Sequence, residues 1–171
     1  MYQVDQPQDR ISTLNLVLLS FVTCGIYSII YLWRIIPSLI QYTQKSFKYR
    51  DFLLAITICL GVSILMTSFS YEMAMTFVND YLEGIDSEAD FSEYMLGVQV
   101  FDLLASFLTL ASGILYIILS FKLRAFIEEY AKEKKINLST NKVMTFFFSI
   151  FYINYLINQT LTLEENQKTG A

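Results

Sequence analysis

Two carboxylates, Glu72 and Asp102, are the side chains whose positions could support chemistry in this sequence. Glu72 follows one long apolar stretch, residues 52–71, and Asp102 precedes another, residues 103–121. If these stretches form antiparallel helices, both carboxylates lie near the same end of the pair, where two facing acids can hold a cation. The alternative, which the sequence favours, is that both are charges at a membrane boundary in contact with water.

The remaining composition favours a non-enzymatic protein. The sequence has no histidine, and its two cysteines, Cys24 and Cys59, lie inside apolar stretches. Buried free thiols are expected there, rather than a disulfide or a metal site. No glycine-rich loop is placed to hold phosphate, and no nucleophile lies beside an obvious base. We therefore expect no catalytic residue, no cofactor and no metal.

Four apolar stretches must position these residues, and charged segments separate them. They span residues 11–33, 52–71, 103–121 and 143–157. The first three approach or exceed the roughly 20 apolar residues with which a helix crosses a bilayer. We expect an all-α integral membrane bundle of four hydrophobic segments with a central antiparallel hairpin. It forms a single membrane domain over residues 11–159, between a short polar segment, 1–10, and a polar tail, 160–171.

Charge in the connecting loops predicts the orientation of this domain. The loops 34–51 and 122–142 are rich in lysine and arginine, whereas the loop 79–94 has six acidic residues and no basic one. Short basic loops stay in the cytoplasm. We therefore expect the two basic loops inside and the acidic loop outside. The basic residues are accounted for by this topology, so nucleic-acid binding is not expected.

The two outer stretches leave two interpretations open. As plain spans they put both ends of the chain outside, and the length of 11–33 favours this interpretation. As re-entrant segments they dip into the membrane and return, with the first turning at Gly25. The stretch 143–157 would reach only about 22 Å as a helix, less than a hydrocarbon core of about 30 Å. A faint internal echo, 26–32 against 151–156, would give both stretches one behaviour if they are true repeats, although apolar sequence produces such echoes easily.

Small residues recur at every fourth position of the two central stretches. In lipid, such stripes let helix backbones approach closely. We expect direct packing of the two helices along these stripes, although small residues are frequent enough for the match to arise by chance. The stripes contain Ala55, Cys59, Ser63 and Thr67 on one helix, and Ala105, Thr109 and Gly113 on the other.

Two cytoplasmic segments have the pattern of an amphipathic helix: a looser one after Pro37, with Ile36, Leu39, Ile40 and Phe47, and a clearer one at 122–135. In the clearer segment the apolar residues recur at helical spacing, with lysine and glutamate on the other side. Such basic helices lie on the inner leaflet and attract anionic lipid. A sharper interpretation is a docking face for a cytosolic partner, and a third is a plain continuation of the membrane helix. The face comprises Leu123, Phe126, Ile127 and Tyr130.

The segment LSFVTCGIYSIIYLWR, residues 19–34, resembles the first hydrophobic segment of a known family. The chain is similar here to the small bacterial integral membrane proteins of the domain of unknown function 4234 family. The closing segment, 148–158, resembles the family's last pattern in part, because the family usually has glutamine where Asn154 stands. The resemblance implies a bacterial cytoplasmic membrane protein and supplies no activity. The matching residues are Thr23, Gly25, Ile26, Tyr27, Arg34 and Asn158.

These patterns favour a small multi-pass membrane protein that acts as a non-enzymatic accessory or regulatory subunit. Its expected contacts are anionic lipid of the inner leaflet and a larger membrane protein partner, or a second copy of itself. One alternative is a small transporter or channel with a polar path near Glu72 and Asp102. Another is an immunity protein against a membrane-active toxin.

Overall fold

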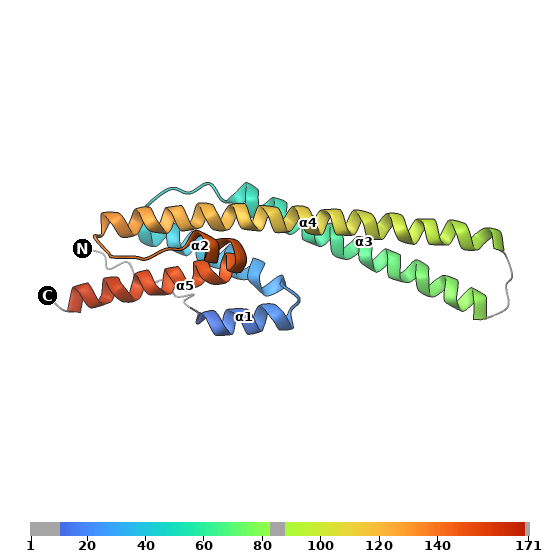
Figure 1. Ribbon diagram of the computed structural model, residues 1–171, viewed down its shortest axis with the longest axis horizontal. Coiled ribbons are helices and arrows are strands. Elements are labelled where there is room, and N and C mark those ends of the chain that lie inside the picture. Colours follow the sequence, from blue (N-terminus) through green and yellow to red (C-terminus); the bar gives the residue numbers. More distant parts are fainter. Residues whose placement is uncertain (1–10, 83–87, 170–171) are drawn as a thin grey trace. The chain divides into compact units, whose positions relative to one another are not determined.

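The computed structural model describes residues 11–82 and 88–169, with side chains outside 81–93 and 168 (Figure 1). All the regular secondary structure of these residues is helical, which confirms the all-α fold class. Most of the acidic residues of the expected outer loop lie outside the described side chains. The helices are α1 (Thr13–Val22), α2 (Ile26–Thr43), α3 (Arg50–Leu82), α4 (Glu88–Glu133) and α5 (Lys142–Thr169).

The chain folds as two compact units. Unit 1 combines Met1–Leu53 with Leu115–Ala171, and unit 2 is Leu54–Ile114. By length and composition, α3 and α4 are each long and apolar enough to cross a membrane. Among the described residues these are the two helices of that kind, so a bundle of four membrane-spanning segments is not confirmed.

The first apolar stretch is not one helix. It forms α1 and α2, which Figure 1 shows as a hairpin, with the break at residues 23–25. Cys24 has φ 49° and Gly25 has φ 88°, both in the left-handed region. The favoured interpretation of 11–33 as a plain spanning helix is therefore wrong, because the backbone reverses within it. The turn lies at Gly25, where the re-entrant alternative placed it.

The last apolar stretch is also interrupted. Within α5, Ser149 has φ 39° and ψ −114°, so the helix consists of two parts joined at a kink. The second part continues well past residue 159, to Thr169, and buries Leu161 and Glu164. Residues 160–169 are therefore not a separate polar tail, because their apolar side belongs to the core of unit 1.

The conformation of Gly25 gives a matched pair of predictions. An alanine Cβ at Gly25 would meet no atom within 4 Å, so the cost of Gly25→Ala is conformational. We expect a loss of about 1 kcal/mol from placing an L-residue at positive φ. Gly113 also has open space around it but lies inside α4, so Gly113→Ala should gain about 0.5–1 kcal/mol of stability. Thermal unfolding in mild detergent, followed by circular dichroism, tests the opposite signs; equal shifts would contradict the assignment of the turn.

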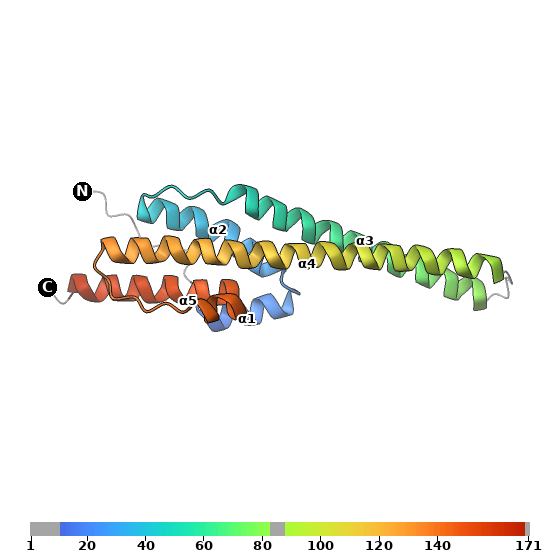
Figure 2. The same ribbon diagram turned by 45° about the horizontal axis from the view of Figure 1, so that its top comes forward.

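Unit 2 is an antiparallel hairpin of α3 and α4 (Figure 2). The Ser63 hydroxyl donates to Ala105 O at 3.1 Å and lies 2.7 Å from Thr109 Oγ1. Phe69 packs near Phe101 further along, with ring centroids 6.2 Å apart. The two small-residue stripes thus meet at their centre.

The ends of the two stripes are looser than their centre. Ala55 and Cys59 are half-buried, and Thr67 donates to Ser63 O within its own helix. Gly113 is exposed, with no atom within 4 Å of an added Cβ. The expectation that Gly113 permits close approach of α3 is therefore wrong, because no neighbouring atom lies close to it.

Candidate functional site

A buried carboxylate lies where α2, α4 and α5 meet in unit 1. Glu164, on the second part of α5, is only 6% exposed. Its Oε2 accepts hydrogen bonds from the Tyr42 hydroxyl at 2.8 Å and from the Tyr130 hydroxyl at 2.9 Å. Tyr42 lies near the end of α2 and Tyr130 near the end of α4, so one carboxylate joins three helices.

Burial changes the acid–base behaviour of both tyrosines. Burial, reinforced by Glu164, raises the pKa of Tyr42 to about 12. The same two causes raise the pKa of Tyr130 above its ordinary value. Both hydroxyls therefore stay protonated and keep donating to Glu164 at every physiological pH. The arrangement fixes a carboxylate between helices and has no nucleophile to activate.

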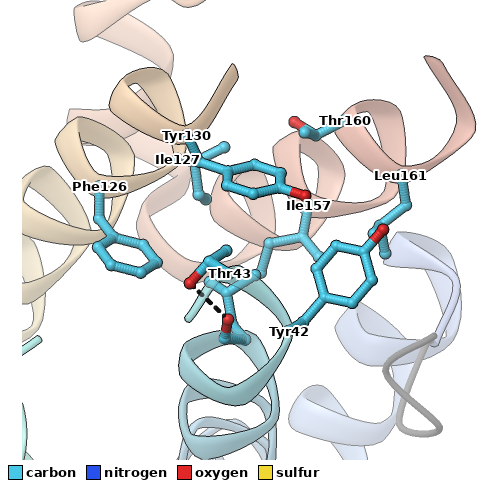
Figure 3. Close-up of a pocket in the computed structure, with 9 residues that line it drawn as sticks. Tyr42, Thr43, Phe126, Ile127, Tyr130, Ile157, Thr160 and Leu161 are labelled. Atoms are coloured by element: carbon cyan, nitrogen blue, oxygen red, sulfur yellow. Dashed lines mark hydrogen bonds between the residues drawn. The ribbon is translucent and has the colours of Figure 1, made fainter. Parts of the chain in front are cut away.

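The cavity beside these tyrosines is small and apolar. Figure 3 shows the Tyr42 and Tyr130 rings together with Phe126 and Ile157 around it. The space open to the centre of a water molecule is about 10 Å³. This is about the minimum that holds a single water. The site is therefore a packed junction of helices, with no room for a substrate.

The face predicted to dock a cytosolic partner forms part of this junction. Its four residues are between 1% and 7% exposed. Leu39 of α2 and Leu161 of α5 line the same cavity, and the Phe47 ring lies 5.4 Å from that of Phe126. The prediction of a free docking face is wrong, because the chain covers it with its own helices. The buried residues are Leu123, Phe126, Ile127 and Tyr130.

Ion pairs border the junction on its exposed side. Lys45 Nζ lies 2.6 Å from Glu133 Oε1 and 2.9 Å from Glu129 Oε1. Glu133, and then Glu129, raise the pKa of Lys45. Both glutamates are exposed, so these pairs contribute little to stability and mainly link the chain after α2 to α4.

A second polar cluster surrounds Asn154, which is 0% exposed. The Tyr31 hydroxyl donates to its Oδ1 at 2.5 Å, and its Nδ2 donates to Ile11 O and Thr13 Oγ1, each at 3.1 Å. Asn158 Nδ2 also donates to Ile11 O, at 2.9 Å. Asn154 and Asn158 therefore hold the start of α1 against α5. Asn154 thus bonds from α5 to α2 and to the start of α1.

Of the other residues that match the family resemblance, Thr23, Gly25, Ile26 and Tyr27 lie at the first turn, and Arg34 lies further along α2. The Thr23 hydroxyl donates to Leu19 O at 2.7 Å and accepts from Tyr27 N at 2.9 Å. Tyr27 is half-buried, whereas Ile26 and Arg34 are exposed. Thr23, Gly25 and Tyr27 therefore build the turn, and Asn158 secures the other end of α1.

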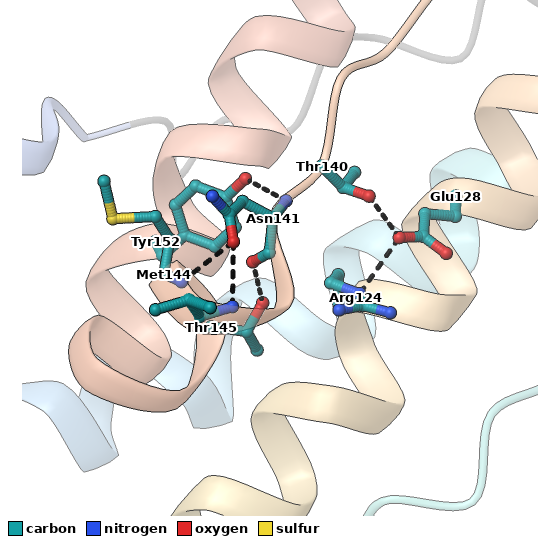
Figure 4. A network of polar contacts seen from close by, with 8 residues as sticks. Arg124, Glu128, Thr140, Asn141, Met144, Thr145 and Tyr152 are labelled. Carbon is teal, nitrogen blue, oxygen red and sulfur yellow. Dashed lines mark hydrogen bonds and ion pairs between the residues drawn. The ribbon is translucent and has the colours of Figure 1, made fainter.

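A third network joins α4 to the start of α5 (Figure 4). Arg124 Nε lies 2.9 Å from Glu128 Oε1, which also accepts from the Thr140 hydroxyl. The next residue, Asn141, donates its amide to the Tyr152 hydroxyl at 2.8 Å. Its Oδ1 accepts the amide of Val143 at 2.8 Å and caps α5. This network positions the first part of α5.

Unit 2 does not bring Glu72 and Asp102 together. An added Cβ on Gly97 would lie 2.5 Å from Met73 Cε, and Phe69 packs near Phe101. These two contacts fix the register of the hairpin. In this register Asp102 is displaced from Glu72 along the helix axes by about one helical turn, or about 5 Å. Both carboxylates are exposed. Asp102 instead shares a groove with hydroxyl-bearing residues, Thr67, Ser106 and Thr109.

Glu164 and Tyr42 were missed as site residues by the sequence analysis. Glu164 lies in the segment assigned to a polar tail, so its spacing from the residues before it was not considered. Ile157, Leu161 and Glu164 recur at helical intervals and are all buried. That periodicity, continued past residue 159, is the signal that could have found them.

No family model, curated protein or solved structure matches the chain. The resemblance to the domain of unknown function 4234 family stays a prediction. Among the residues that the structure describes, no group of three or more His, Cys, Asp or Glu side chains could hold a metal ion.

Proposed function

We propose that the chain is a small multi-pass protein of the bacterial cytoplasmic membrane, with α3 and α4 crossing the bilayer. In this proposal it acts without catalysis, as an accessory or regulatory subunit, through contacts with lipid and with a larger membrane protein. The observation that carries the membrane location is the inverted distribution of side chains in unit 2.

The α3–α4 hairpin of unit 2 exposes its large apolar side chains and buries small polar ones. Leu65 is 58% exposed and Phe107 69%, whereas Ser63 and Ser112 are buried. A helix pair in water buries the apolar face and exposes the polar one. In lipid the driving force for packing comes instead from close contact and from hydrogen bonds between helices, which Ser63 makes with α4. This distribution supports lipid as the surroundings of unit 2.

The charge of the segments flanking α3 and α4 supports one orientation. The segments 34–51 and 122–142 are basic, and the segment 79–94 has six acidic residues and no basic one. Basic flanks stay in the cytoplasm. The segment between α3 and α4 therefore faces outward, and the junction around Glu164 lies at the cytoplasmic ends of α2 and α4.

A transporter or channel is the second candidate, and the groove of Asp102 favours it. This carboxylate shares an open groove with Thr67, Ser106 and Thr109 on an otherwise apolar helix pair. Carboxylates within membrane segments are costly and mark ion or substrate paths in many proteins. Glu72 does not line this groove, so the polar path would depend on Asp102.

The test is affinity purification from native membranes in mild detergent, followed by mass spectrometry. A larger membrane protein recovered in stoichiometric amount would support the accessory role. Recovery of the chain alone would contradict that role, and ion flux in liposomes, lost in Asp102→Asn but kept in Glu72→Gln, would then establish the second candidate. Release of the protein from membranes by alkaline carbonate would contradict the membrane location itself.

A further inference from the structure

We infer that unit 1 contains two hairpins that enter the cytoplasmic leaflet part-way and return to the cytoplasm. The amino-terminal hairpin is residues 11–34, and the carboxy-terminal hairpin is residues 142–157. The inference rests on the proposed crossing of the membrane by α3 and α4. It assigns lipid hydrocarbon as the partner of both hairpin tips and places the chain before α1 and after α5 in the cytoplasm.

The turn of the amino-terminal hairpin provides partners for its own backbone N–H groups. All six amides from residue 23 to residue 28 donate hydrogen bonds within the hairpin, at 2.7–3.2 Å. A turn in water needs no such completeness, because water replaces missing partners, whereas hydrocarbon replaces none. The acceptors, in chain order, are Leu19 O, Phe21 O, Ser20 O, Thr23 O, the Thr23 hydroxyl and Gly25 O.

The tips of both hairpins are apolar and exposed. Phe21, next to the first turn, is 85% exposed, and Phe147, next to the kink at Ser149, is 72% exposed. The hydroxyls near the first turn bond to each other instead of pointing outward: Ser28 Oγ donates to Ser20 Oγ at 2.7 Å, and both residues are buried. Aromatic tips without exposed charge fit insertion into lipid.

The carboxy-terminal hairpin reverses the chain at Ser149. The amide of Asn141 reaches the Tyr152 hydroxyl at 2.8 Å. In a straight helix these residues would be about 16 Å apart along the axis, at about 1.5 Å per residue. The first part of α5 therefore folds back along the second.

Contacts within unit 1 place the tips of the two hairpins at the same height along α2 and α5. Tyr31 bonds to Asn154 and Tyr42 bonds to Glu164, so α2 and the second part of α5 run parallel. Gly25 precedes Tyr31, and Ser149 precedes Asn154, by a similar number of residues. The two breaks therefore lie at the same height along these parallel helices.

The tips of the two hairpins lie beside the apolar part of α4. The Ser28 hydroxyl lies beside that of Tyr116, within the apolar stretch 103–121. At the opposite end of α2, Tyr42 meets Tyr130 in the basic segment that follows. If α4 crosses the membrane, the tips lie at hydrocarbon depth and the bases at the cytoplasmic surface.

The shorter helix of each hairpin is too short to cross the hydrocarbon core of a membrane. The 10 residues of α1 extend about 15 Å, half of a hydrocarbon core of about 30 Å. The first part of α5, from Lys142 to the kink at Ser149, extends about 10 Å. Each hairpin therefore reaches no further than the middle of the bilayer.

Cysteine labelling in native membranes tests this inference with the full chain. The native Cys24, at the exposed tip, is the reporter of insertion in a Cys59→Ala background. Gln3→Cys reports the side of the amino-terminal segment, and Ser87→Cys reports the segment between α3 and α4; both are made with Cys24→Ser and Cys59→Ala. Ser46→Cys, in the exposed chain between α2 and α3, is the matched aqueous control. The reagent is a membrane-impermeant sulfonated maleimide, applied to intact cells and to inverted vesicles.

We expect Ser87→Cys to react in cells, and Gln3→Cys and Ser46→Cys to react in inverted vesicles alone. Cys24 should react at least tenfold more slowly than Ser46→Cys in inverted vesicles and become reactive after denaturation in detergent. Labelling of Gln3→Cys in cells, or reaction of Cys24 at the rate of the control, would overturn the inference while leaving the proposed function in place. Failure of Ser87→Cys to react in cells would overturn the proposed crossing of α3 and α4 instead.

Discussion

Asn154→Ala should destabilise unit 1 more than any other single truncation of a polar side chain described above. The substitution removes three hydrogen bonds from a fully buried position and leaves the Tyr31 hydroxyl and the Thr13 hydroxyl without this partner. We expect a loss of about 3 kcal/mol, because buried polar groups that lose their partners cost about 1–3 kcal/mol each. Thermal unfolding in mild detergent, followed by Trp33 fluorescence, measures it, since Trp33 is the single tryptophan and lies in α2.

Two tyrosine variants make the Asn154 prediction specific. Tyr31→Phe removes one of the three bonds and should cost about 1 kcal/mol. Tyr155, the residue after Asn154, is half exposed. Tyr155→Phe should therefore leave the unfolding midpoint unchanged. An Asn154→Ala midpoint equal to that of Tyr155→Phe would show that the cluster does not hold α1 in place.

Glu164→Ala is expected to be the second most destabilising change. It removes the acceptor shared by Tyr42 and Tyr130 and leaves both hydroxyls at a packed junction. Hydrogen bonds to charged groups contribute about 1.5–3 kcal/mol, so we expect a loss of about 2 kcal/mol, and a smaller one for Glu164→Gln, which keeps an acceptor oxygen. Asn166→Ala, at an exposed position of the same helix turn, is the control, and the Trp33 unfolding midpoint is again the measurement. A loss no larger than that of the control would contradict a structural role for the carboxylate.

The pH dependence of this junction has a definite sign. The folded pKa of Tyr42, about 12, lies above its ordinary value of 10.0. Its contribution to stability is therefore complete below pH 10 and is lost as the pH rises from about 10 to about 12. The tyrosinate absorbance of the wild type minus that of Tyr42→Phe should titrate with a midpoint near 12. A midpoint near 10 would show that Tyr42 is not held in the junction.

The sequence predicted which segments are helical better than it predicted what covers them. Apolar spacing identified the face that includes Phe126 and Tyr130, but periodicity shows that a face is apolar and not which surface packs on it. Lipid, a partner protein and another helix of the same chain all satisfy the same pattern. The covering residues, among them Leu39 and Leu161, lie far away in the sequence.

The two interruptions of helix differed in how far they could be foreseen. Gly25 marks the first, because glycine tolerates positive φ and Thr23 can bond to the following backbone. Ser149 lies in a run of apolar residues with no glycine or proline nearby, so local propensity gives no warning of a positive φ there. The limited length of 143–157 was the useful sign, since it excluded an easy crossing.

The breaks at Gly25 and Ser149 also bear on biosynthesis. All 12 basic residues of the sequence lie outside 51–121, and two of them, Arg10 and Lys168, lie before the first and after the last apolar stretch. Plain spans would require the cell to export both of these cations against an inside-negative potential, at about 2.3 kcal/mol per charge for about 100 mV. With the proposed hairpins, which return to the side from which they entered, the export machinery would carry across a single acidic segment and no basic residue.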